Sequence, residues 1–198
     1  ISKLENINCN LLFLPEIHDI YSNGLVKNKI VNNFRNILCD KFRPGHFDGV
    51  TTVVDIFFDI IKPTNSYFGE KDFQQVKIIK DLVKINNHNI KIIQCPSIRD
   101  KTGMSLSSRN YKFSNDQSKT FNILGNIIKK YINLLKQNEV NNLDKLKIEL
   151  QQNNINKIDY LEIRNENNLE ITKNYSEARL FIAIYIGEVR IIDNFKLY

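Results

Sequence analysis

A glycine followed by charged residues at the start of a helical pattern is the segment of this chain best suited to chemistry. Residues 66–75 read SYFGEKDFQQ, so that a short strand pattern passes through Gly69 into Lys71 and Asp72. A glycine lets the backbone approach a ligand, a helix N-terminus offers free N–H donors, and a lysine adds a mobile positive charge. The turn therefore suits phosphate. The alternative is a capping box formed by Asp72 and Gln75, and from this turn alone the two interpretations are equally supported.

A second segment, rich in hydroxyl and guanidinium groups, lies further along the chain. Residues 99–110 read RDKTGMSLSSRN. The hydroxyls and the guanidinium groups of Arg99 and Arg109 suit phosphate oxygens, and Gly103 would let the loop move over a ligand. Taken alone, however, this segment is better explained as an ordinary surface loop with turn residues.

The apolar pattern around the glycine turn predicts a strand–helix–strand unit. Residues 50–61 place apolar side chains at helical spacing and stop before Pro63, which predicts a largely buried helix. A short strand is expected at 66–68, an amphipathic helix at 72–85, and a strand at 90–95. This order predicts a parallel sheet.

The two ends of the chain show other patterns. Near the N-terminus, the apolar run 11–14 is ended by Pro15 and predicts a buried strand, followed by a short helix at 16–21. The C-terminal half predicts a small α+β unit with antiparallel strands. Its expected helices are 115–136 and 143–150, and its expected strands are 158–163, 179–184 and 189–192. We expect a domain boundary near residues 96–98.

The composition is typical of a soluble globular protein. Hydrophobic residues at 42% and charged residues at 25% argue against disorder and against a membrane protein. The three cysteines, Cys9, Cys39 and Cys95, are an odd number without C-x-x-C spacing. We therefore expect no disulfide framework, no structural metal site and a reducing cytoplasmic location.

The net charge of +6 would fit an anionic partner such as a nucleotide, a nucleic acid or a membrane surface. Lysine is scattered along the chain rather than gathered on one stripe, and asparagine, lysine and isoleucine are abundant in every segment, as a strong codon bias would produce. We therefore expect neither a nucleic acid nor a membrane as partner.

Three segments, in this order and spacing, resemble the family of pantoate–β-alanine ligases, also called pantothenate synthetases. They are residues 43–54, which read RPGHFDGVTTVV, the glycine turn at 66–75 and the loop at 99–110. Agreement extends to further short motifs at 13–15 (FLP), 21–24 (YSNG), 178–180 (ARL) and 187–194 (GEVRIIDN). Several ordered motifs are more specific than any one of them, so the phosphate-binding interpretation of the glycine turn is now favoured.

The resemblance implies an α/β fold, with a Rossmann-like nucleotidyltransferase domain in residues 1–97 and a small α+β domain in 98–198. It also implies a reaction. The pantoate carboxylate attacks the α-phosphate of ATP and releases pyrophosphate, and the β-alanine amine then opens the pantoyl adenylate with loss of AMP. Mg²⁺ accompanies the ATP, and the family is usually dimeric, so a homodimer is expected.

The resemblance also assigns residues by motif. Four residues of the glycine turn should line the ATP site, namely Gly69, Glu70, Lys71 and Asp72. Lys71 should offset charge on the phosphates, and Gln75 should hold pantoate. Ile98 falls where a backbone group meets the adenine, and the mobile phosphate-binding loop comprises Leu106, Ser107, Ser108 and Arg109. The expected catalytic residues are Lys71, Ser107, Ser108 and Arg109.

The histidines differ in what the sequence says of them. His46 follows Pro-Gly and precedes an apolar helix, so contact with the nucleotide or the substrate and a local capping or hydrogen-bonding role are equally supported. His18 and His88 lie outside the matched motifs, and we expect both on the surface.

Two departures from the family pattern carry expectations of their own. The H-x-G-H turn and the N-P-x-Q segment of the family's N-terminal third do not occur in this sequence, and Ile56 stands where the family usually has a lysine. We therefore expect the chain by itself to be a fragment that does not make pantothenate. Two alternatives are an inactive nucleotide-binding remnant of such a ligase and a nucleic-acid-binding module, whose binding would depend steeply on salt.

Overall fold

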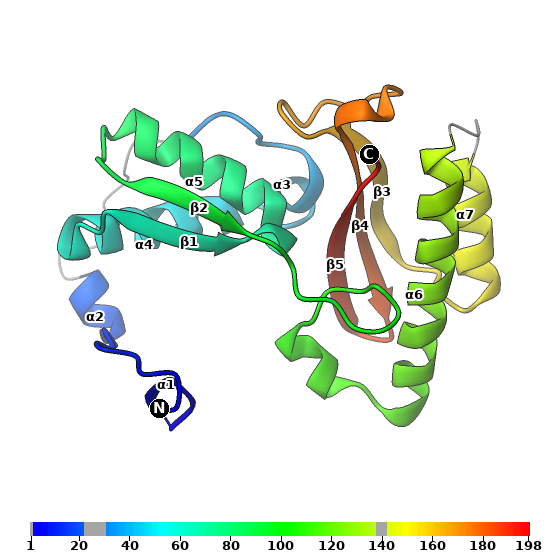
Figure 1. Cartoon of the computed structure of the whole chain (residues 1–198), viewed down its shortest axis with the longest axis horizontal. Helices are drawn as coiled ribbons and strands as arrows, with labels where there is room; N and C mark the ends of the chain where they lie inside the picture. The colour runs from blue at the N-terminus through cyan, green and yellow to red at the C-terminus, as the bar shows by residue number, and fades with distance from the viewer. Residues whose placement is uncertain (1, 22–30, 138–141) are drawn as a thin grey trace.

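The computed structural model describes residues 2–21, 31–137 and 142–198, and it places a parallel α/β unit beside an antiparallel sheet that is backed by helices (Figure 1). The helices are α1 (Ser2–Glu5), α2 (Ile17–Ile20), α3 (Leu38–Phe42), α4 (His46–Ile61), α5 (Phe73–Ile85), α6 (Asn115–Lys136) and α7 (Asn142–Gln152), with short 3-10 helices η1 (Glu70–Asp72), η2 (Ser108–Lys112) and η3 (Tyr175–Glu177). The strands are β1 (Asn65–Gly69), β2 (Lys91–Cys95), β3 (Ile158–Asn165), β4 (Ala178–Ile186) and β5 (Val189–Lys196).

The predicted strand–helix–strand unit is confirmed. β1 and β2 pair in parallel, with Gly69 opposite Cys95 at their carboxyl ends, and α5 connects them. One face of α5 is buried because its apolar residues recur at helical spacing, as Val76, Ile79 and Leu82 do. This pairing brings the glycine turn and the end of β2 to the same edge of the sheet.

The burial predicted for the helix at 50–61 is only partly right. Helix α4 begins earlier, at His46, and its buried residues are Phe47, Thr51, Asp55 and Phe58. Of the predicted apolar stripe only Phe58 is buried, while Val53, Val54 and Phe57 are half-buried and Ile61 is exposed. The buried side of α4 therefore carries polar groups. Thr51 donates to the Phe47 carbonyl of the same helix at 2.8 Å, and Asp55 is bonded by residues that follow α5.

The same contact corrects the expectation for His88. Its Nε2 lies 2.6 Å from Asp55 Oδ1, and the Asn86 amide donates to the same oxygen at 2.7 Å. The imidazole also packs edge-on against the Phe58 ring, and only 12% of its side chain is exposed. His88 is thus an interior residue that pairs with a buried carboxylate, whereas His18 lies on the surface as expected.

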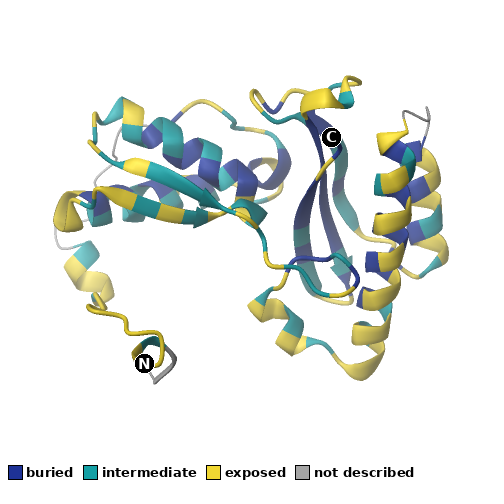
Figure 2. Ribbon diagram, in the orientation of Figure 1, coloured by how far each residue is buried: buried dark blue, intermediate teal, exposed yellow. Residues whose placement is uncertain are grey.

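The antiparallel unit confirms the pattern predicted for the C-terminal half. The sheet order is β3-β4-β5, and α6 and α7 begin and end close to the predicted limits. Successive residues of β4 point to opposite faces of the sheet. Leu180 and Ile182 pack into the core with α6 and α7, while Phe181 and Ala183 pack into the core with α5. Figure 2 shows this strand buried along its length, so one sheet supports both halves of the molecule.

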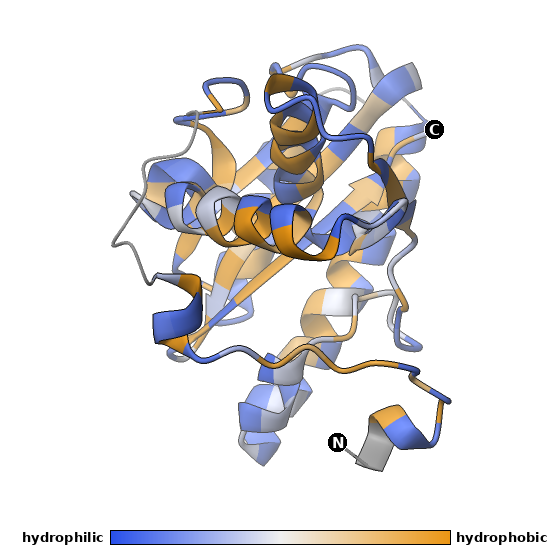
Figure 3. Ribbon diagram, turned by 90° about the vertical axis from the view of Figure 1, so that its left-hand side faces the viewer, coloured by the Kyte–Doolittle hydropathy of each residue, from blue (hydrophilic) through white to orange (hydrophobic). Residues whose placement is uncertain are grey.

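The N-terminal segment corrects another expectation. Residues 11–14 form no strand, and Leu11 and Leu14 are 83% and 76% exposed. A strand needs a neighbour for its backbone hydrogen bonds, and among the described residues the parallel sheet holds β1 and β2 alone. Figure 3 shows this apolar stretch running free of the sheets. The short helix is confirmed as α2, while residues 22–24 of the YSNG motif lie outside the described residues. Of the helices described, none is long and apolar enough to cross a bilayer.

Candidate active site

The glycine turn lies where a doubly wound α/β fold binds its ligands, beyond the carboxyl end of a parallel strand. β1 ends at Gly69, η1 follows, and α5 begins at Phe73. The φ of Gly69 is −70°, and an added Cβ would meet no described atom within 4 Å. The backbone therefore does not need a glycine for its conformation, and the space beside it is open. Asp72 makes no side-chain cap, so the capping-box interpretation is wrong.

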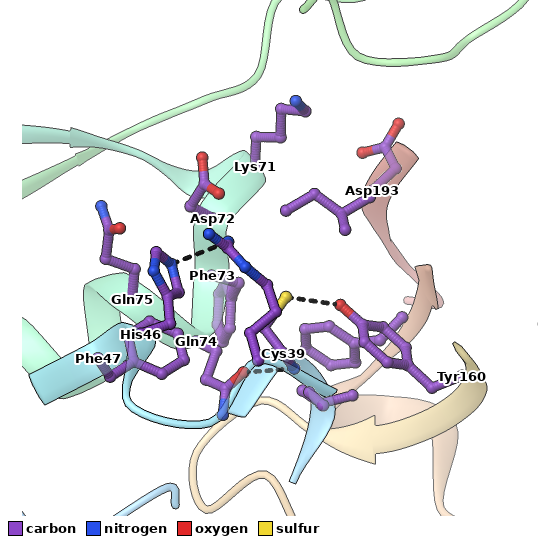
Figure 4. A pocket seen from close by; sticks show the side chains of 14 residues that line it. Cys39, His46, Phe47, Lys71, Asp72, Phe73, Gln74, Gln75, Tyr160 and Asp193 are labelled. Atoms are coloured by element: carbon purple, nitrogen blue, oxygen red, sulfur yellow. Dashed lines mark hydrogen bonds between the residues drawn. The ribbon is translucent and has the colours of Figure 1, made fainter. Parts of the chain in front are cut away.

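Several of the predicted residues meet at one pocket. Lys71, Asp72 and Gln75 line it together with His46, the first residue of α4, and Arg43, which follows α3 (Figure 4). The enclosed volume is only about 30 Å³, which suits a single water rather than a nucleotide. A larger ligand would therefore lie across the open mouth of this pocket, where Figure 4 places the ends of Lys71 and Asp72.

The surroundings of His46 favour an uncharged imidazole that can donate a hydrogen bond. Its Nε2 lies 3.0 Å from Arg43 Nη1, and because a guanidinium only donates, Nε2 accepts and Nδ1 carries the hydrogen. Burial, followed by the nearby charge of Arg43, lowers the pKa of His46. The imidazole is therefore neutral near pH 7, and the local hydrogen bond does not exclude a ligand contact through Nδ1.

The floor of the pocket was not predicted from the sequence. Cys39 Sγ lies 3.1 Å from Tyr160 Oη, and Gln74 Oε1 accepts a hydrogen bond from the Cys39 amide at 2.9 Å. Burial, and after it the neighbouring Cys39, raises the pKa of Tyr160. These residues come from α3, α5 and β3, so no local motif could have linked them. Arg43 could have been found, since it opens the matched segment 43–54.

Glu70 points away from the other residues of its turn. Its Oε2 accepts from Arg179 Nη2 at 3.1 Å and from the Gln94 amide at 3.3 Å, and its Oε1 accepts from the Ser97 N–H at 3.4 Å. Burial alone would raise the pKa of Glu70, but Arg179 and these donors outweigh burial and hold the pKa below its usual value. The carboxylate of Glu70 therefore ties the turn to β2 and β4.

The first half of the loop 99–110 is fixed on β5. Arg99 Nη1 donates to the Gly103 carbonyl at 2.8 Å and to Asp193 Oδ2 at 3.1 Å. Asp193 also accepts the Ser105 N–H at 2.7 Å, and Met104 is buried in the core beside α6. Gly103 has a φ of 90° and closes a hydrogen-bonded turn here, so its glycine is required by the shape of this turn.

The second half of the loop is open to solvent. Ile98 and Leu106 are exposed, and the Leu106 N–H donates to the Ile98 carbonyl at 2.9 Å. Ser107 is half-buried and caps η2 through the Arg109 N–H, while Ser108 and Arg109 are exposed. None of these residues lines the pocket.

A strand nevertheless links the loop to the pocket. Arg109 Nη1 donates to the Arg190 carbonyl at 3.0 Å, and β5, which carries Arg190, also contributes Ile192 and Asp193 to the pocket wall. Ile56, at the position of the family lysine, is half-buried in α4.

Two larger hollows lie elsewhere. One, of about 590 Å³, opens at the amino ends of β1 and β2, near Asn65 and Lys91, which is the wrong end of the strands for a ligand of this fold. The other, of about 630 Å³, lies between α7 and β3 and contains none of the motif residues. In the described chain, no group of acidic, histidine or cysteine side chains has the arrangement of a metal site.

Comparisons with known proteins identify relatives of the whole chain. The family model for pantoate-beta-alanine ligase matches residues 1–196. A pantothenate synthetase of Clostridium botulinum is 38% identical over 98% of this chain and 70% of its own length, and one of Azobacteroides pseudotrichonymphae is 37% identical over 96% and 70%.

Solved structures give the same result. The pantothenate synthetase of Thermus thermophilus superposes with a TM-score of 0.91 at 28% identity, covering all of this chain and 73% of that one. The pantoate-beta-alanine ligase of Francisella tularensis, solved in complex with beta-gamma ATP and beta-alanine, gives 0.83 at 37% identity, covering 99% and 68%. These matches span both halves of the chain, which therefore belongs to the pantoate–β-alanine ligase family.

Proposed function

We propose that this protein joins pantoate to β-alanine at the expense of ATP, with the pocket at the carboxyl end of β1 as its adenylation site. The observation that supports the proposal most directly is the meeting of Lys71, Asp72, Gln75 and His46 at that pocket. In the first step, a pantoate carboxylate oxygen bonds to the α-phosphorus of ATP and the bond to pyrophosphate breaks. In the second, the β-alanine nitrogen bonds to the carbonyl carbon, AMP leaves with the bonding electrons, and the amine loses a proton.

Lys71 is the catalytic residue of the first step in this proposal. Negative charge builds up on the bridging oxygen and the departing pyrophosphate as the bond lengthens. An ammonium group already held at the mouth of the pocket stabilises that charge more in the transition state than in the ground state. The N–H groups at the start of α5 would add partial positive charge on the same side.

Asp72 is suited to hold the Mg²⁺ that accompanies ATP. Its carboxylate is exposed beside Lys71, and it makes no hydrogen bond or ion pair with the described residues. Mg²⁺ in nucleotide sites is bound through one or two carboxylates, the phosphates and water, so a dedicated protein cage is not required. When bound, the ion would neutralise phosphate charge.

Gln75 and His46 suit the organic substrates. The Gln75 amide lines the pocket and can both donate to and accept from the carboxylate and hydroxyl groups of pantoate. The neighbouring Gln74 is unavailable, because its amide is used by the carbonyls of Phe34 and Ile37 and by the Cys39 N–H. Neutral His46 would donate from Nδ1 without adding charge.

The exposed loop residues complete the proposal. Ile98 would meet the adenine through its backbone, and Leu106, Ser107, Ser108 and Arg109 would cover the phosphates from the side opposite Lys71. The proposed division into residues 1–97 and 98–198 places the glycine turn in one unit and this loop in the other. Movement of the exposed loop residues would then bring the two sets of phosphate ligands together.

Compartment and assembly are also part of the proposal. The cysteines are free, which fits a reducing cytoplasm. A homodimer is expected from the family resemblance, and sedimentation equilibrium of the purified protein would test it.

The reaction order can be tested by isotope exchange between ATP and labelled pyrophosphate in the intact gene product. Exchange should require pantoate and proceed without β-alanine, because the adenylate forms before the amine is needed. Pantothenate formation without any such exchange, and with release of ADP, would contradict an adenylate intermediate.

A further inference from the structure

Asn194 joins the antiparallel sheet to the glycine turn. It lies on β5 and is 1% exposed. Its Nδ2 donates to the carbonyls of Glu70 at 2.8 Å and Lys71 at 3.0 Å, while its Oδ1 accepts from Arg179 Nη1 at 2.6 Å. Both hydrogens of the amide are therefore used, which fixes its orientation.

The glycine turn has little local support of its own. Neither Gly69 before η1 nor Asp72 before α5 makes a side-chain cap. A single 3-10 turn is a weak element by itself, so contacts from elsewhere must decide its backbone position. Those contacts come from Asn194 and from Arg179, which also pairs with Glu70 and stacks on the Phe73 ring at 4.4 Å.

We propose that Asn194 is a positioning residue for adenylation. By holding the carbonyls of Glu70 and Lys71, it fixes the backbone from which the side chains of Lys71 and Asp72 reach the mouth of the pocket. The inference rests on the proposed function, in which Lys71 stabilises charge on the phosphates. A lysine side chain is long and mobile, so the place of its ammonium group depends on where its backbone is held.

An isosteric change separates this role from packing. Asn194→Asp keeps the shape and the acceptor for Arg179, but it replaces both donors with an oxygen that faces two carbonyl oxygens. The turn should move away from β5, and a displacement of about 1 Å can slow an enzyme by about 100-fold. We expect pantoate-dependent pyrophosphate release in a single turnover to slow by roughly 10- to 100-fold. The reaction of β-alanine with preformed pantoyl adenylate should stay close to normal.

The decisive experiment is a double-mutant cycle in the intact gene product. Single-turnover pyrophosphate release is measured for the wild type, Asn194→Asp, Lys71→Ala and the double variant. If Asn194 acts through Lys71, Asn194→Asp slows the wild type but adds nothing in the Lys71→Ala background. Asn126→Asp, the same change at an exposed position of α6, is the control and should leave the rate unchanged.

The outcomes are distinguishable. If Lys71→Ala is slow but Asn194→Asp is normal, this inference fails and the proposed function stands. Equal slowing by Asn194→Asp in both backgrounds would assign Asn194 to the fold alone and overturn the inference. A normal rate for Lys71→Ala would overturn the proposed function itself. Should circular dichroism show that Asn194→Asp does not fold, Asn194→Ser, which removes one donor without adding charge, takes its place in the same cycle.

Discussion

The two segments proposed to bind phosphate are held in different ways. The glycine turn is tied by buried groups: Arg179 is 1% exposed, and it pairs with Glu70 and with Glu166. The first half of the loop 99–110 is tied through Asp193, which bonds Arg99 and the buried Ser105 N–H. In the second half Ser108 and Arg109 are exposed, and Arg109 is held to β5 by a surface hydrogen bond to the Arg190 carbonyl.

The difference suits two tasks. A rigid turn can hold a charge in place before the reaction starts, and a loop with one end held only by a surface contact can leave and return as substrates exchange. Both segments are anchored on neighbouring residues of one strand, since Asp193 holds the loop and Asn194 holds the turn. Strand β5 therefore fixes the position of the glycine turn relative to the first half of the loop.

The largest expected effect comes from removing the anchor of the turn. Arg179→Met would leave two carboxylates facing a buried position without their partner, and breaking such a pair costs about 3–5 kcal/mol. The free energy of unfolding, measured by urea denaturation at pH 7, should fall by that amount. Arg99→Met removes the charged partner of Asp193, whose side chain is fully buried, but the Ser105 and Asn194 N–H groups still bond this single carboxylate, so the loss should be smaller. An equal loss would show that the two segments are held alike.

Lys71→Ala should slow adenylate formation by about 100-fold or more, the scale for losing one preorganised charge-stabilising group. The free energy of unfolding should hardly change, because Lys71 contributes its backbone rather than its ammonium group to the fold. Single-turnover pyrophosphate release measures the effect. Lys84→Ala, exposed on α5, is the matched control. A near-normal rate for Lys71→Ala would show that the glycine turn only begins helix α5 and takes no part in catalysis.

Arg109→Ala should have a smaller effect on the same step, about tenfold, as expected for the loss of one charge-assisted hydrogen bond. The β-alanine step on preformed adenylate should be much less affected, because the pyrophosphate that Arg109 is proposed to hold has already left. Rapid-quench measurement of both half-reactions tests this. Lys112→Ala, also exposed on η2, serves as control. Equal slowing of both half-reactions would assign Arg109 to the whole cleft rather than to the phosphates.

The smallest expected effect concerns His46. Because its pKa is lowered in the folded state, the unfolded chain binds a proton more readily, so the free energy of unfolding should fall as the pH drops below the ordinary histidine value of about 6.5. His46→Gln should remove part of that pH dependence, and His18→Gln, on the surface, should not. Urea denaturation between pH 5 and pH 8 measures the difference. Identical profiles for the wild type and His46→Gln would contradict a neutral, half-buried imidazole.

Patterns along the chain predicted most elements but not all of their surroundings. The capping box of Ser114 and Gln117 and the Pro63 break are local signals, so the limits of α6 and the C-terminal end of α4 were accessible, whereas the start of α4 at His46 was not predicted. The strand predicted from the apolar run 11–14 was wrong, because an apolar run shows only that burial would be favourable, not that a neighbouring strand is in place. The face of the helix at 50–61 predicted to be buried was only partly right, for a related reason. Asp55 is buried because His88 and Asn86, which are distant in the sequence, bond to it.

The sequence by itself determined the parallel unit, the antiparallel sheet and the family, because periodicity and ordered motifs are properties of neighbouring residues. Through the family resemblance it also pointed to Lys71, Asp72 and Gln75 as residues of one site, and it left the role of His46 open. Only the tertiary structure decided that Glu70 belongs to the scaffold, that Cys39 and Tyr160 form the pocket floor, and that Asn194 holds the turn. These contacts join residues far apart in the chain, and their geometry depends on how the shared sheet packs against α5.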